Sequence, residues 1–144
     1  MFQKIDLSKL LFLDIETVPE KASFDQLSDT EKEFFAAKTK YQRAEDQTPA
    51  SFYEKAGIWA EFGKIICISV GYFASDSPSR AFRITSFYGE EKEILSQFNS
   101  LIERHFKHPK FVLCAHNGKE FDFPYIARRM IINKMKLPSK LNLF

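Results

Sequence analysis

The sequence predicts an α/β domain in which a mixed β-sheet carries helices on its faces. Short apolar runs rich in β-branched and aromatic residues alternate with longer amphipathic or charged segments. One expected helix lies between two expected strands, and such a helix allows the crossover that parallel strands need. A chain of 144 residues with 44% hydrophobic composition also has the size of one ordinary domain with a single core.

The first expected strand, residues 10–15, is a continuous apolar run that suits a strand buried on both faces. Charged, helix-favouring sequence then runs from about residue 21 to 63 and is broken at Thr48-Pro49, which predicts a helical insertion in the domain. The remaining elements are expected to be a hairpin of strands 64–74 and 80–88 joined by an SDSPS turn, an amphipathic helix 89–108, a strand 110–115 and a helix 120–136.

Overall composition says little about partners. The net charge of +2 is too close to neutral to indicate nucleic acid by itself, so any substrate signal must be local. Cys67 and Cys114 each lie within an apolar run, which favours buried thiols over a disulfide, and no run approaches the length of a membrane span. A cytoplasmic location is therefore expected.

Two carboxylates stand at the end of the first expected strand. Strand alternation sends Asp14 and Glu16 to one face and Ile15 to the other. At about 4 Å their repulsion is about 4 kcal/mol for an effective dielectric constant near 20, and a cation would relieve it. Oxygen ligands of this kind suit Mg²⁺ or Mn²⁺. The alternative, that both side chains simply face water at a strand end, is not excluded by this motif alone.

A second group of polar residues joins the fourth expected strand to the last helix, in the stretch HNGKEFDFPYI. In one interpretation this is an ordinary connection, with a turn at Gly118, a cap at Asp122 and Pro124 in the first helical turn. In the other, strands 10–15 and 110–115 lie parallel in the sheet centre, and Asp122 reaches the same metal ions as Asp14.

Two segments carry a resemblance to a known family. LFLDIET and HNGKEFDFPYI resemble the first and second exonuclease motifs of the DEDD superfamily, and most closely those of predicted 3′–5′ exonucleases related to the proofreading domain of family B DNA polymerases. AGIWAEFGKIICISVGYF is similar to the segment between these motifs, so the likeness covers most of the chain.

The resemblance implies a ribonuclease H-like fold and a two-metal 3′–5′ exonuclease using Mg²⁺ or Mn²⁺. Asp14 would bridge both ions, Glu16 would bind the ion that holds the attacking water, and Asp122 would anchor the other. The 3′ end of a single-stranded nucleic acid, expected to be DNA, would contact Thr17, Asn117 and Phe121. For Phe121, an ordinary core position at helical spacing remains the alternative.

One part of the family pattern is missing. The family has a fourth Asp, after a Tyr or His in a later helix, whereas no Asp follows Asp122 here. Either the sequence is C-terminally truncated, which the apolar ending 141–144 favours, or it is a degenerate homologue. The chain by itself is then expected to be close to inactive. A non-catalytic ribonuclease H-like module that binds nucleic acid or protein is the rival interpretation.

Basic residues near the C-terminus leave two alternatives open. Five cations could either follow a phosphate backbone or complement the C-terminus of the last helix: Arg128, Arg129, Lys134, Lys136 and Lys140. His116 beside Cys114 does not indicate zinc, because a zinc site needs more ligands at matching spacing.

Overall fold

The computed structural model describes residues 5–74 and 81–142, and the chain separates into two compact units. Met1–Glu16 and Ile65–Phe144 form one, here called the sheet unit, and Thr17–Lys64 forms the other, the helical unit. The helical unit buries a hydrophobic cluster of its own, formed by large side chains of the inserted segment.

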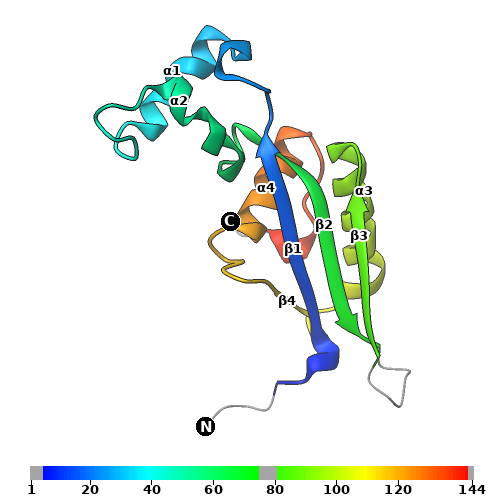
Figure 1. The fold of residues 1–144 in the computed structure, drawn as a ribbon. Helices are drawn as coiled ribbons and strands as arrows, with labels where there is room; N and C mark the ends of the chain where they lie inside the picture. The colour runs from blue at the N-terminus through cyan, green and yellow to red at the C-terminus, as the bar shows by residue number, and fades with distance from the viewer. Residues whose placement is uncertain (1–4, 75–80, 143–144) are drawn as a thin grey trace. The chain divides into compact units, whose positions relative to one another are not determined.

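The sheet has four strands in the order β3-β2-β1-β4. Their bounds are Leu10–Pro19 for β1, Gly63–Phe73 for β2, Phe82–Tyr88 for β3 and Val112–Cys114 for β4. β1 pairs with β4 in parallel and β2 pairs with β3 antiparallel, while β1 and β2 run in opposite directions (Figure 1). The mixed sheet expected from the sequence is confirmed.

β1 and β4 are parallel neighbours, as expected, with Leu10 opposite Val112 and Phe12 opposite Cys114. Two details of the expectation were wrong. β4 is the edge strand of the described sheet rather than a central one, and β1 continues through Pro19 rather than ending at Ile15. The acidic pair therefore lies inside β1, just beyond the point where its pairing with β4 stops.

The hairpin of β2 and β3 is regular over the part that the structure describes. Its pairs run from Cys67 opposite Tyr88 to Phe73 opposite Phe82, which confirms the antiparallel pairing. The expected SDSPS turn lies outside the described residues.

Two long helices of the sheet unit, α3 (Glu91–Leu101) and α4 (Asp122–Ile132), lie behind the sheet in Figure 1 and contact each other. A π-helical segment, Ile102–Phe106, continues α3. The core beneath them consists of side chains from both layers: Leu11, Leu13, Ile15, Ile68, Val70, Ile94, Leu95, Phe98, Ile126 and Met130, all at most 6% exposed. Their apolar periodicity is what the sequence predicted.

α4 ends at Ile132, four residues before the expected boundary. Lys134 has a left-handed φ of 57°, and its amide donates to the Ile131 carbonyl while the Met135 amide donates to Met130. This is the Schellman arrangement, which satisfies the last carbonyls of a helix and stops it. Glycine usually occupies that position, and because a lysine stands there, the sequence did not indicate that the helix ends.

The helical unit contains α1 (Asp29–Thr39), α2 (Pro49–Phe52) and the 3-10 segments Phe24–Gln26 and Tyr53–Ile58. Both α-helices begin with a capping box, from Ser28 with Glu31 and from Thr48 with Ser51. Its core is largely aromatic and comprises Leu27, Phe35, Phe52, Tyr53, Ala56 and Phe62, with Phe24 and Trp59 packed against them. The insertion expected at about 21–63 falls within this unit.

No helix within residues 5–74 and 81–142 is long and apolar enough to cross a membrane. Cys67 and Cys114 are both free and half-buried, whereas their apolar surroundings in the sequence suggested buried thiols.

Candidate functional site

The two acids of β1 point away from the helices. Asp14 and Glu16 are exposed, whereas Ile15 between them is 6% exposed and belongs to the core. The alternation inferred from the sequence therefore holds through the acidic pair. β1 presents both carboxylates on its solvent-facing side.

The turn between β4 and α4 depends on two residues with different roles. Asn117, rather than Gly118, has the left-handed backbone, with φ of 53°, and its carbonyl accepts hydrogen bonds from the amides of Glu120 and Phe121. Gly118 is needed for space, since a Cβ there would lie 2.7 Å from the Ala115 Cβ. The turn expected at Gly118 is thus one residue earlier, where Asn tolerates the left-handed region.

Asp122 is the first residue of α4 rather than its cap. The N-cap is Phe121, which makes no capping bond through its side chain. Asp122 is 2% exposed, an unusual position for an acid. The Ile15 amide of β1 lies close enough to its carboxylate to favour the charged form. The start of α4 is therefore near the segment that carries the two β1 acids.

The electrostatics of Asp122 reflect its burial and its neighbours. Burial raises the pKa of Asp122 above 3.8, and the negative charge of Asp14 raises it further. Hydrogen bonds from its own amide and from Ile15, together with the charge of His116, act in the opposite direction but do not cancel the rise. The charge of Asp14 is therefore close enough to disfavour ionisation of Asp122, which is the situation a bound cation relieves.

The place of Asp122 follows from the shortness of β4. β4 stops at Cys114, opposite Phe12, so β1 continues past it without a strand on that side. The Asp122 carboxylate lies near the Ile15 amide in this part of β1. A helix residue and a strand residue are thereby brought together at one edge of the sheet.

The expected site is assembled only in part. Asp14 and Asp122 are brought together, but within the described part of the chain no three His, Cys, Asp or Glu side chains are close enough to hold a metal ion. Glu16 lies on the same side of β1 as Asp14 without completing such a group. Thr17 is half-buried and belongs to the helical unit, so its side chain is not placed relative to these acids.

The two expected substrate contacts differ in exposure. Asn117 is exposed, whereas Phe121 is half-buried and its ring lies 5.4 Å from that of Tyr125. Asn117 borders an open hollow of about 650 Å³ beside β4, whose other walls include Val112, Cys114, Lys119, Phe123 and Lys140. The side-chain amide of Asn117 is available to a ligand, whereas the Phe121 ring is partly exposed and partly packed against Tyr125 of α4.

Two of the five basic residues are used inside the protein. Arg129 is 2% exposed and forms an ion pair with Glu91, and Lys140 donates to the carbonyls of His108 and Phe111. Burial also lowers the pKa of Lys140. Arg128, Lys134 and Lys136 remain exposed. A phosphate-binding role can therefore be considered only for these three.

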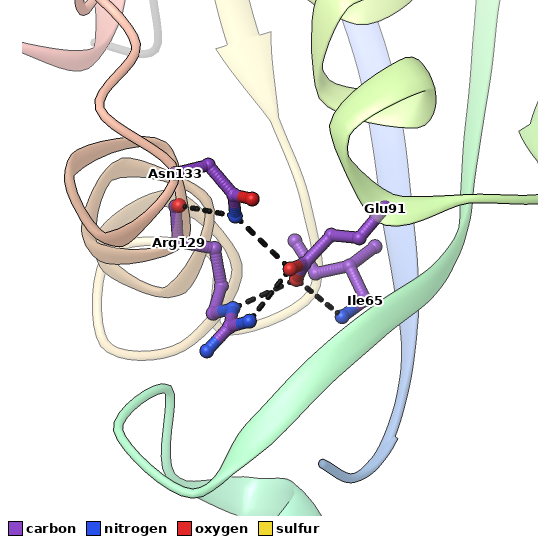
Figure 2. A network of polar contacts seen from close by, with 4 residues as sticks. All are labelled: Ile65, Glu91, Arg129 and Asn133. Carbon is purple, nitrogen blue, oxygen red and sulfur yellow. Dashed lines mark hydrogen bonds and ion pairs between the residues drawn. The ribbon is translucent and has the colours of Figure 1, made fainter.

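Sequence reasoning missed the network around Glu91, which Figure 2 shows. The Glu91 carboxylate accepts hydrogen bonds from Arg129, Asn133 and the Ile65 amide. The available signal was an Arg seven residues after Asp122, on the same side of an amphipathic helix. Its partner could not be found from the sequence, because Glu91 is 38 positions away.

A mixed sheet in the order β3-β2-β1-β4, with acids on β1 and at the start of the helix after β4, defines a ribonuclease H-like α/β domain of the nuclease class. The chain belongs to the family described as DNA polymerase family B, exonuclease domain, whose model matches residues 3–143. The fold class and the family resemblance inferred from the sequence are both confirmed. A comparison with curated proteins finds no match.

Proposed function

We propose that this exonuclease domain acts on single-stranded DNA from the 3′ end in a metal-dependent reaction, with Asp14, Glu16 and Asp122 as its metal ligands. The observation that carries the proposal is the buried Asp122 carboxylate beside Asp14 at the edge of the sheet. Burial and the neighbouring charge of Asp14 make the ionised form of Asp122 unfavourable unless a cation is near. Membership of an exonuclease family gives that cation a role.

The donor set fits a hard divalent ion. Carboxylate oxygens are the ligands that Mg²⁺ and Mn²⁺ prefer, and Mg²⁺ keeps several waters when only one or two carboxylates bind it. Asp14 and Asp122 would hold one ion, and Glu16 would join Asp14 at a second. When bound, such ions activate water and stabilise the leaving oxygen of a phosphodiester.

The protein's own groups orient the acids and the substrate. The nearby Ile15 amide favours the charged form of the Asp122 carboxylate, the form that binds a cation. Asn117 would donate from its exposed amide to the terminal nucleotide, and the exposed part of Phe121 would stack on a base. Thr17, which directly follows Glu16 in β1, is the third proposed substrate contact.

A second candidate is a domain that binds nucleic acid or protein without cutting. It is favoured by one observation, that no three potential ligand side chains converge within the described residues.

Metal binding and cleavage separate the two candidates. We would titrate Mn²⁺ into the wild-type chain, Asp14→Asn and Asp122→Asn by calorimetry, with Asp25→Asn as a control because Asp25 is an exposed acid of the helical unit. The same proteins, together with any longer product of the reading frame, would be incubated with 5′-labelled single-stranded DNA or RNA and Mg²⁺ or Mn²⁺.

The exonuclease proposal expects Mn²⁺ binding that both site variants lose and Asp25→Asn retains, and products that shorten stepwise from the 3′ end. Faster shortening of DNA than of RNA supports the DNA assignment, and the reverse overturns that part. If the oligonucleotide is bound but stays intact in every protein, and the site variants bind it equally well, the non-catalytic candidate replaces this proposal.

A further inference from the structure

Carboxylates lie between α4 and the sheet near both ends of the helix. At its start, the Asp122 carboxylate is close enough to the backbone amide of Ile15 in β1 for that amide to favour its charged form. Near its end, the Glu91 carboxylate accepts a hydrogen bond from the backbone amide of Ile65 in β2 at 2.8 Å and another from Arg129 of α4. One acid of α4 therefore reaches β1 directly, and one acid of α3 connects α4 to β2.

The contacts around Glu91 fill both of its carboxylate oxygens. Arg129 Nε donates to Oε1 at 2.7 Å and Arg129 Nη2 to Oε2 at 2.6 Å, which makes the pair bidentate. Asn133 Nδ2 donates to Oε2 at 3.0 Å and to the Arg129 carbonyl at 2.9 Å. Figure 2 shows these bonds converging from α4 and β2 on the single Glu91 side chain.

Arg129 and Asp122 occupy the same side of α4. They are seven residues apart, which is close to two helical turns and about 10 Å along the axis. A rotation of the helix that moved Arg129 away from Glu91 would therefore swing Asp122 away from the Ile15 amide in the same sense. The helix transmits a change at one end to the other because its backbone is rigid over this distance.

We infer that Glu91 and Arg129 are positioning residues, which set the rotation and height of α4 so that Asp122 meets Asp14 at the sheet edge. This inference rests on the proposed function, because the proposed metal site is the reason for Asp122 to be held near Asp14. Both side chains are nearly buried, 11% exposed for Glu91 and 3% for Arg129.

The chemistry of the pair favours orientation over simple stabilisation. A buried ion pair is frequently no more stabilising than well-packed apolar residues of the same volume, whereas it does specify one arrangement. The planar guanidinium fork meets a carboxylate in one bidentate geometry, which a lysine ammonium does not define. Asn133 and the Ile65 amide then hold the carboxylate itself in place.

The test compares Arg129→Lys, which keeps the charge and removes the fork, with Ile102→Ala. Ile102 is fully buried in the segment after α3, so its truncation lowers stability without touching the Glu91 network. Asn133→Ala is a milder variant that removes one donor to Glu91, and it serves if Arg129→Lys does not fold. The readouts are the Mn²⁺ affinity by calorimetry and amide hydrogen exchange of Ile15 relative to Ile68 in β2.

For Arg129→Lys we expect Mn²⁺ affinity to fall about 10-fold or more, the usual effect of disturbing groups that orient metal ligands. The Ile15 amide should exchange about 10-fold faster relative to Ile68, since moving the nearby Asp122 carboxylate away would leave this amide less protected. Asn133→Ala should change both readouts in the same direction by less. Ile102→Ala should change neither ratio by more than about twofold.

Equal behaviour of Arg129→Lys and Ile102→Ala in both readouts overturns the positioning role. The exchange readout needs no metal, so it tests the inference even if the wild-type chain binds no Mn²⁺. A wild type without Mn²⁺ affinity, combined with faster Ile15 exchange in Arg129→Lys, would refute the proposed metal site and support the positioning of Asp122.

Discussion

Replacing one residue of the Glu91–Arg129 pair should destabilise the fold more than replacing both residues. In Glu91→Leu the Arg129 guanidinium stays buried, and the Ile65 amide and one Asn133 donor lose their acceptor. Removing one partner of a buried ion pair destabilises by about 3–5 kcal/mol. Since whole domains are stable by about 5–15 kcal/mol, such a loss would shift the unfolding transition strongly.

A double-mutant cycle measures the interaction itself. Urea unfolding of wild type, Glu91→Leu, Arg129→Met and the double variant should show the double variant destabilised by at least about 2 kcal/mol less than the sum of the single variants. Arg129→Met removes the charge that loses its Glu91 contact in Glu91→Leu, which is the physical reason. Additivity within about 0.5 kcal/mol would refute the description of the pair as a coupled, buried contact.

The pH dependence of the same variants gives an independent check. Burial would raise the pKa of Glu91, but hydrogen bonds from Arg129, the Ile65 amide and Asn133 outweigh it and lower the pKa below 4.5. A depressed folded-state pKa contributes stability above the unfolded value, and this contribution is lost as the pH falls through the folded value. The wild type should therefore lose more stability than Glu91→Leu when the pH is lowered through and below 4.5.

Three further variants test other features. Lys134→Gly should stabilise the fold by about 0.5–1 kcal/mol in urea unfolding, because glycine takes the left-handed φ of 57° without strain; no gain would contradict the strain. Gly118→Ala should destabilise by about 1–3 kcal/mol because its Cβ would lie 2.7 Å from the Ala115 Cβ, and a neutral result would mean that the turn adapts. Asp122→Asn should raise the Tm at pH 7 but not at pH 3, since a folded-state pKa above 3.8 destabilises only as the pH rises through that window; equal Tm changes at both pH values would refute the raised pKa.

Much of the sheet could be predicted because local patterns determine it. The apolar run of β1, the hairpin of β2 and β3 and the parallel pairing of β1 with β4 all follow from residue types and from the crossover helix. The end of α4 could not be predicted, since Lys134 holds a backbone conformation that the sequence would assign to glycine. The edge position of β4 likewise depends on tertiary pairing rather than on local sequence.

The candidate site was predictable to a similar extent. Alternation alone placed Asp14 and Glu16 on one side of β1, and the parallel strands brought Asp122 close to Asp14. The burial of Asp122 near the Ile15 amide could not be inferred, because it depends on tertiary packing around the end of β4. The burial of Arg129 was also hidden, since a cation in a helix usually lies at the surface.

The brevity of β4 makes chain length critical where surface connections usually tolerate change. Were two residues inserted after Cys114, the strand could continue alongside β1, and its carbonyls would compete with Asp122 for the Ile15 amide. Ordinary loops absorb insertions with little effect on stability. The stretch from Cys114 to Asp122 should not tolerate insertions in this way, because its length decides whether the Ile15 amide faces the Asp122 carboxylate or another strand.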